Sequence, residues 1–213
     1  MRETEKKSSK SESGKFVYAI LIAVIPIIVY LLSFSSVIYN KGFIEQNMRK
    51  AGLMGYALEM NSHVVDYLMD KDEEKFVDLE IFDEKEKSHL LDVKILVHRI
   101  FDFLFVLLVL FFLLVYFNNK LNKGKNWGKI LIYSGMASVL LPIILYFIPF
   151  NAVFNVFHGI FFAPGSWVFP SNSALIQMYP FDFWYNSSFG LFLRGFLTGW
   201  LLIALGFIVE KAR

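Results

Sequence analysis

Two histidines, His89 and His158, lie just outside separate hydrophobic stretches of the chain. Histidine is the side chain whose unperturbed pKa, about 6.5, suits proton transfer near neutral pH. Glu86, His89 and Asp92 follow one another at three-residue spacing, which places them on one face of a helix. Asp92 or Glu86 could then hold a ring N–H of His89 and fix its tautomer. The same spacing also fits a solvated acidic helix with an incidental histidine, so the pattern by itself leaves both interpretations open.

His158 stands in an apolar stretch, N-V-F-H-G-I-F-F, and is followed by Gly159. Such a position disfavours the charged form of the ring. The ring therefore either binds a backbone carbonyl or acts as an acid and base. We expect a turn over Gly159–Trp167, whose backbone N–H groups could stabilise negative charge on an ester oxygen. Arg194, at the outer end of the last apolar stretch, could bind a carbonyl or phosphate group or pair with Asp102.

Four apolar blocks approach the length of about 20 residues that crosses the hydrocarbon core of a bilayer. They are Phe16–Val37, Ile100–Phe117, Ile130–Phe150 and Phe189–Val209. Each is predicted to be a helix, because an isolated span in lipid must satisfy its own backbone hydrogen bonds. With 56% hydrophobic residues in 213, the chain is predicted to be an all-α membrane protein with four transmembrane helices.

The basic residues predict the orientation of these spans. Lys and Arg gather in residues 1–15, in residues 118–129 and at the C-terminus, whereas residues 151–188 contain neither. Because basic residues favour the cytoplasmic side, we expect both termini inside and two loops outside. The formal net charge of +2 conceals this asymmetry.

The predicted organisation has one large polar insertion and one aromatic loop. In order, we expect a disordered basic cytoplasmic tail (1–15), a first span (16–38), an extracellular cap (39–98), a second span (99–117), a cytoplasmic loop (118–129), a third span (130–150), an extracellular or interfacial aromatic loop (151–188), a fourth span (189–209) and a cytoplasmic tail (210–213). In the cap we expect short helices, with a small β element as an option, formed by Phe76–Phe82 and Asn40–Glu45. Glu84–Arg99 is predicted to be a helix that continues into the second span.

Several chemistries have no support in the residues. The chain has no Cys, which excludes disulfides and thiol nucleophiles. Gly165-Ser166-Trp167 lacks the G-x-S-x-G spacing of a nucleophile elbow, and no Walker A, HExxH or EF-hand pattern occurs. The histidines and acids lack the tight spacing of a zinc site. We therefore expect no metal and no cofactor.

Three stretches resemble one family. They are Glu86-x-x-His89-x-x-Asp92-Val93, then F-H-G-I-F-F (Phe157–Phe162) through Trp167, and L-I-Q-M-Y-P-F-D-F-W (Leu175–Trp184). Together with the four-span layout, they resemble the lipoprotein intramolecular transacylase (Lit) family of bacterial integral membrane proteins. The resemblance extends from the first predicted span to the fourth.

The resemblance implies a reaction on a lipoprotein whose N-terminal Cys carries an S-diacylglyceryl group. The sn-2 acyl chain of that group moves to the α-amine and leaves a lyso-form lipoprotein, without an outside acyl donor. The two essential histidines of the family correspond to His89 and His158. Asp92, Glu86, Arg194, Trp167 and Gly159 are the expected supporting residues.

The resemblance also implies a location and partners. We expect a bacterial plasma-membrane protein, a monomer, with its site on the extracellular face, in contact with the lipoprotein substrate and membrane lipids and with no nucleic acid. Two alternatives stay open. One is an intermolecular phospholipid acyltransferase or phospholipase that uses the same histidines, and the other is a non-enzymatic lipoprotein-binding membrane protein.

Overall fold

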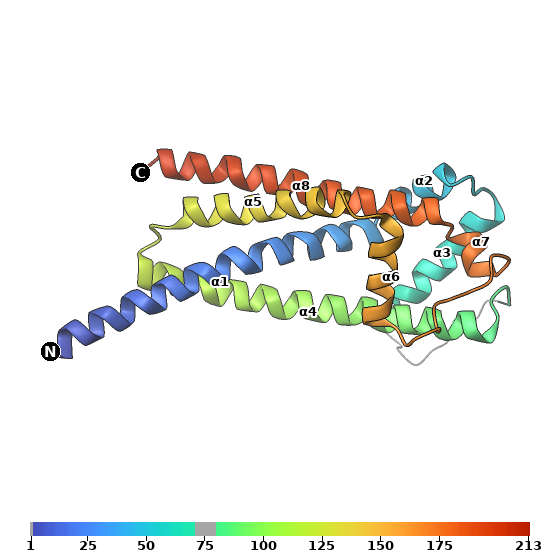
Figure 1. The fold of residues 1–213 in the computed structure, drawn as a ribbon, viewed down its shortest axis with the longest axis horizontal. Coiled ribbons are helices and arrows are strands. Elements are labelled where there is room, and N and C mark those ends of the chain that lie inside the picture. Colours follow the sequence, from blue (N-terminus) through green and yellow to red (C-terminus); the bar gives the residue numbers. More distant parts are fainter. Residues whose placement is uncertain (1, 71–79) are drawn as a thin grey trace. The chain divides into compact units, whose positions relative to one another are not determined.

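The computed structural model describes residues 2–70 and 80–213, with side chains described from residue 12 onward. These ranges are helical with connecting turns and contain no strand. The helices are α1 (Arg2–Ile38), α2 (Lys41–Lys50), α3 (Tyr56–Met69), α4 (Glu84–Asn122), α5 (Trp127–Tyr146), α6 (Phe150–Phe161), α7 (Ala174–Met178) and α8 (Phe181–Lys211) (Figure 1).

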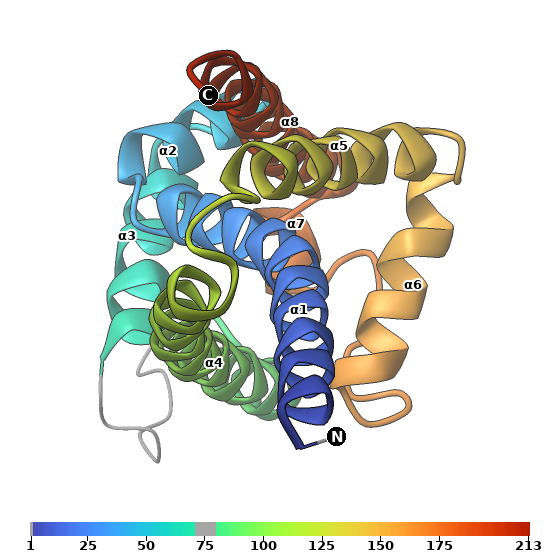
Figure 2. The ribbon, with the colours of Figure 1, turned by 90° about the vertical axis from the view of Figure 1, so that its left-hand side faces the viewer.

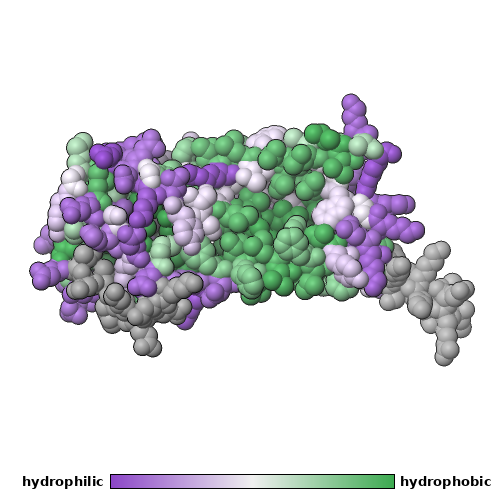
Figure 3. Space-filling view, turned by 180° about the vertical axis from the view of Figure 1, so that it is seen from behind, coloured by the Kyte–Doolittle hydropathy of each residue, from purple (hydrophilic) through white to green (hydrophobic). Residues whose placement is uncertain are grey.

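Four of these helices are long and apolar enough to cross a membrane, which confirms the predicted four-span protein. The qualifying ranges are Glu12–Ile38, Glu84–Asn122, Trp127–Tyr146 and Phe181–Lys211. Large apolar side chains stay exposed along them, including Phe105, Phe112 and Leu201, as expected of residues that face lipid. On the face shown in Figure 3, hydrophobic residues gather over a broad area of the surface.

The predicted helix from Glu84 into the second span is confirmed by α4, but two other expectations differ from the structure. Helix α1 begins at Arg2, so residues 2–14 continue the first span as helix where a disordered tail was expected. The predicted strand Asn40–Glu45 is wrong, because Asn40 is the N-cap of α2. Its Oδ1 accepts a hydrogen bond from the Phe43 N–H at 2.9 Å, an arrangement that starts a helix.

The other predicted strand lies mostly outside the described residues. Positions 76–79 of Phe76–Phe82 are not described, and the remaining positions, 80–82, form a turn and a bend.

The chain forms two compact units. The span unit contains the residues up to Ser33 together with Phe103–Ile144 and Phe192–Arg213. The loop unit contains Phe34–Asp102 and Leu145–Leu191. Both predicted site histidines belong to the loop unit.

The span unit packs α1 between α4 and α5, with α8 against α5 (Figure 2). Leu21 of α1 and Ile130 of α5 are fully buried in its core. Gly135 and Gly199 let α5 and α8 approach closely, because a Cβ at Gly135 would lie 2.5 Å from the Gly199 carbonyl oxygen. The Tyr30 hydroxyl also donates a hydrogen bond to the Ser138 carbonyl at 2.6 Å. Small residues and such polar contacts are the usual means by which helices associate in lipid.

The loop unit has two apolar clusters that hold its short helices. The first consists of Val64, Tyr67, Phe82, Leu90, Leu175 and Met178, and the second of Ile44, Met48, Val65 and Phe183. Between helices, the Tyr179 hydroxyl donates to Asn61 Oδ1 at 3.1 Å. Burial raises the pKa of Tyr179, so its hydroxyl stays protonated as a donor.

Candidate functional site

The structure brings His89 and His158 together inside the loop unit. His89 lies in the second turn of α4 and His158 in the last turn of α6. Their ring centroids are 6.2 Å apart and the ring planes are inclined by 29°. Each residue is only 9% exposed. Two segments far apart in the chain thus supply two buried, nearly parallel imidazoles.

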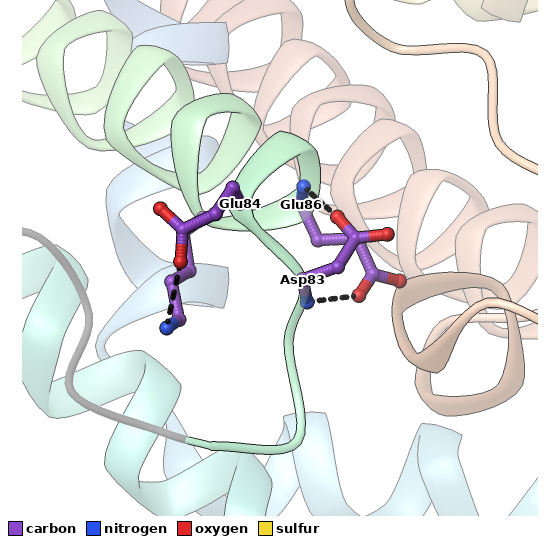
Figure 4. A network of polar contacts seen from close by, with 4 residues as sticks. Asp83, Glu84 and Glu86 are labelled. Carbon is purple, nitrogen blue, oxygen red and sulfur yellow. Dashed lines mark hydrogen bonds and ion pairs between the residues drawn. The ribbon is translucent and has the colours of Figure 1, made fainter.

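The first turn of α4 positions His89 and is fixed by a reciprocal cap. The Asp83 N–H donates to Glu86 Oε2 at 2.9 Å, and the Glu86 N–H donates to Asp83 Oδ1 at 2.8 Å (Figure 4). This exchange satisfies N–H groups that a helix end leaves open. The other oxygen of Glu86, Oε1, accepts a hydrogen bond from the Leu175 N–H at 2.9 Å. Glu86 therefore joins the start of α4 to α7.

Lys85 provides a second link between α4 and the segment after α6. Its Nζ donates to the Val168 carbonyl at 2.6 Å and lies 5.0 Å from the centre of the Phe169 ring. The Phe169 ring in turn lies 5.5 Å from the His89 ring. Lys85 and Glu86 together hold residues 168–175 against the first turn of α4, one turn before His89.

Aromatic rings surround the two imidazoles. The His158 ring lies 4.0 Å from Phe154 and 4.7 Å from Trp167 between centroids. Phe162 contacts both histidines, at 4.9 Å from His89 and 5.4 Å from His158. The side chains around the pair are therefore mostly apolar.

The hydrogen bonds determine which nitrogen of His158 can act as a base. His158 Nδ1 lies 2.8 Å from the Phe154 carbonyl oxygen, and because a carbonyl only accepts, Nδ1 must carry the hydrogen. In the neutral ring, Nε2 then holds the free lone pair. Burial lowers the pKa of His158, and the hydrogen bond to Phe154 raises it by a smaller amount. The ring is thus held as the neutral base.

His89 has no comparable partner. Its Nδ1 is buried and, within the part of the chain that the structure describes, no hydrogen-bonding group reaches it. Asp92 is half-buried on the same helix, and the hydrogen bond that its spacing suggested is not formed. Glu86 is likewise committed to Asp83 and Leu175. The two acids expected to orient His89 therefore do not bind its Nδ1 directly.

Of the remaining predicted site residues, Trp167 contacts a site histidine, whereas Gly159 and Arg194 lie elsewhere in the helices. Gly159 lies inside α6, not in a turn, and a Cβ there would meet nothing within 4 Å. The turn comes later and contains Gly165, whose φ of +81° requires glycine. Trp167 is the last residue of this turn and contacts His158. Arg194 is half-buried on α8 and belongs to the span unit.

The sequence did not single out several contact residues, among them Phe162, Phe169 and Lys85. Phe162 lies four residues after His158 and Lys85 lies four before His89, so helical spacing could have suggested both. Phe169 has no such signal, because it reaches His89 from an irregular segment. Among the residues whose side chains are described, no group of three or more His, Asp or Glu gathers in a way that could hold a metal ion.

Comparison with known proteins gives a family match and a fold match. The family model described as lipoprotein intramolecular transacylase Lit matches residues 15–184. An uncharacterised protein of Aquifex aeolicus is 30% identical over 133 residues, which are 61% of this chain, and the chain spans 58% of that relative's length.

Solved structures of the membrane integral lipoprotein intramolecular transacylase Lit from Bacillus cereus have a similar fold. One is 20% identical, with a TM-score of 0.78 and coverage of 95% of this chain and 99% of the other. A second, in which a histidine is replaced by arginine, is also 20% identical, with a TM-score of 0.77 and coverage of 99% and 98%.

Proposed function

The chain belongs to the lipoprotein intramolecular transacylase (Lit) family of membrane proteins, and on this basis we propose that it remodels lipoproteins. The substrate carries an S-diacylglyceryl group on its N-terminal Cys and has a free α-amine. The sn-2 acyl chain moves to that amine, which gives an N-acyl, S-monoacylglyceryl product. The single observation that carries the proposal is the buried pair of His89 and His158, with ring centroids 6.2 Å apart.

The attacking amine must lose a proton. An α-amine has a reference pKa of about 7.7–8.0, so a substantial part of it is protonated near neutral pH and only the neutral form attacks. His158 offers a free Nε2 lone pair, because its Nδ1–H is used by Phe154. We assign His158 as the principal acid and base, which accepts the amine proton as the new N–C bond forms.

The leaving glycerol oxygen must gain a proton as its bond to the acyl carbon breaks. His89 or His158 delivers it, so the proton lost by the amine is matched by the proton gained by the glycerol hydroxyl. Positioned proton transfer of this kind contributes about 10²–10⁴-fold to a rate. Backbone N–H groups near Trp167 are candidate donors to the developing oxyanion. No covalent acyl-enzyme is needed, because donor ester and acceptor amine belong to one molecule.

The proposed orientation places both termini in the cytoplasm and the loop unit outside. Support comes from the basic residues 1–15 and 118–129 and from the absence of Lys and Arg in residues 151–188. The substrate reaction would then take place at the outer surface of the plasma membrane, with lipids around a monomer.

The test is conversion of purified diacylated lipoprotein, followed by mass spectrometry of the N-terminal lipopeptide. We expect His158→Ala and His89→Ala each to abolish formation of the N-acyl product while the protein accumulates in the membrane. His63→Ala is the matched control, because His63 is exposed and should leave conversion unchanged. Full conversion by either variant would remove that histidine from the mechanism.

The same assay separates the alternatives. Turnover with no other lipid ester present supports the intramolecular route, whereas a requirement for added phospholipid would indicate an intermolecular acyltransferase or phospholipase. A lipoprotein-binding protein would retain binding, and would show no conversion even in its unmodified form.

A further inference from the structure

The ring of Phe162 lies at the centre of the aromatic enclosure. Among the rings that the structure describes, it is the one that contacts both imidazoles, edge-on to His89 at 4.9 Å and tilted toward His158 at 5.4 Å. Phe162 is 8% exposed, immediately after the end of α6. Trp167 covers the His158 ring and Phe169 the His89 ring from neighbouring positions.

A base that can deprotonate an amine can also deprotonate water. Attack by water on the same ester carbon would break the same C–O bond, release a free fatty acid and return the proton to the glycerol oxygen. The tethered amine benefits from proximity only when it is held in an attack geometry. Which nucleophile receives the acyl group therefore depends on whether water can reach the imidazoles.

The enclosure offers water few partners. A buried water needs two to four polar partners. His158 Nδ1 is already bonded to the Phe154 carbonyl, and His89 Nδ1 is buried among rings without a described partner. A water between the imidazoles would find the free nitrogens of the two rings, with the rings of Phe162, Trp167 and Phe169 around them.

We propose that Phe162 is the specificity-determining residue that keeps water from the two imidazoles, so that the acyl group passes to the amine and is not hydrolysed. This inference rests on the proposed function. Removal of the ring opens a void beside both histidines, which water can fill. The amine then competes with a second nucleophile.

The experiment compares Phe162→Ala and Phe162→Leu with Phe161→Ala in isotopically labelled water. Phe161 is the matched control, because it is the adjacent phenylalanine, is 50% exposed and contacts no imidazole among the described rings. The ratio of labelled free fatty acid to N-acyl peptide is measured by mass spectrometry. We expect this ratio to rise about tenfold or more in Phe162→Ala, which corresponds to a relative barrier change of about 1.4 kcal/mol. Phe162→Leu should give a smaller rise, and Phe161→Ala should match the unmodified protein.

A second measurement does not depend on turnover. The rate of modification of each histidine by diethyl pyrocarbonate reports its access to solvent, with exposed His63 as the internal reference. We expect His89 and His158 to react faster, relative to His63, in both Phe162 variants. If Phe162→Ala does not accumulate in the membrane, the product ratio and the modification rates of Phe162→Leu alone test the proposal.

The experiment distinguishes a failure of the Phe162 proposal from a failure of the proposed function. An unchanged product ratio, or a loss of N-acyl product without labelled acid, overturns the role of Phe162 in excluding water. Unmodified protein that forms no N-acyl product overturns the proposed function itself, whatever the Phe162 variants do.

Discussion

The carboxylate of Glu86 gives the sharpest test of how the site is held together. Glu86 is 2% exposed and accepts hydrogen bonds from the N–H groups of Asp83 and Leu175. A hydrogen bond to a charged group contributes about 1.5–3 kcal/mol, and a buried N–H left without a partner costs about 1–3 kcal/mol. Glu86→Gln retains one oxygen and turns an NH₂ group toward the second N–H. We expect a loss of about 2–3 kcal/mol in holding α7 to α4.

Hydrogen exchange at the Leu175 amide measures this loss directly. At about 1.4 kcal/mol for each tenfold change, exchange at Leu175 should be on the order of 100-fold faster in Glu86→Gln, because local opening controls exchange. Two controls separate the roles of the carboxylate. Asp83→Ala removes the helix cap, worth about 1 kcal/mol, and should leave Leu175 protected.

The second control is the neighbouring acid of the same helix turn. Glu84 forms an exposed ion pair with Lys87 at 3.3 Å (Figure 4), which is worth less than about 1 kcal/mol, so Glu84→Gln should change neither stability nor exchange. Wild-type protection of Leu175 in Glu86→Gln would refute the reasoning, since the carboxylate would then not hold the segment that carries the site.

Two further predictions concern stability, each measured as the midpoint of thermal unfolding in detergent. Gly199→Ala should destabilise by about 1–3 kcal/mol, because its Cβ would lie 2.9 Å from the Gly135 carbonyl oxygen. Gly159→Ala, in open space on a helix, should be neutral or stabilise by up to about 1 kcal/mol. An equal effect of the two would contradict the close packing of α5 on α8. The native pKa of His158 is lowered, so below pH of about 6.5 the unfolded chain binds a proton that the folded chain does not. Stability should therefore fall as pH falls below that value, and His158→Gln should reduce the dependence of the unfolding midpoint on pH. Parallel plots of midpoint against pH for the two proteins would contradict this role of His158.

Much of the local structure was predictable because it depends on neighbours in the chain. A run of apolar residues long enough to cross a bilayer must be helical wherever it packs, and the four spans were found for that reason. The start of α4 was similarly visible, since Asp83, Glu84 and Glu86 are acidic residues, which are favourable near a helix N-terminus.

Two local predictions were wrong: the strand at Asn40–Glu45 and the turn directly after His158. Asn40–Glu45 was considered as a second strand to pair with Phe76–Phe82, yet Asn40 caps α2. The turn expected after His158 begins later, because α6 continues through Gly159 to Phe161. In both cases the observed helix is locally acceptable, because Asn is a favourable N-cap residue and a glycine inside a helix costs only about 1 kcal/mol relative to alanine.

By itself the sequence determined the number of spans, the apolar character of residues 151–188 and the presence of two histidines beside spans. Only the tertiary structure decided that Glu86 binds the Leu175 N–H and not His89. It also decided that Phe162 touches both imidazoles and that Gly135 meets Gly199. The physical reason is that each of these contacts joins different elements of the chain. Spacing along the sequence sets which side chains share a helix face, but the packing of separate elements sets which groups they meet.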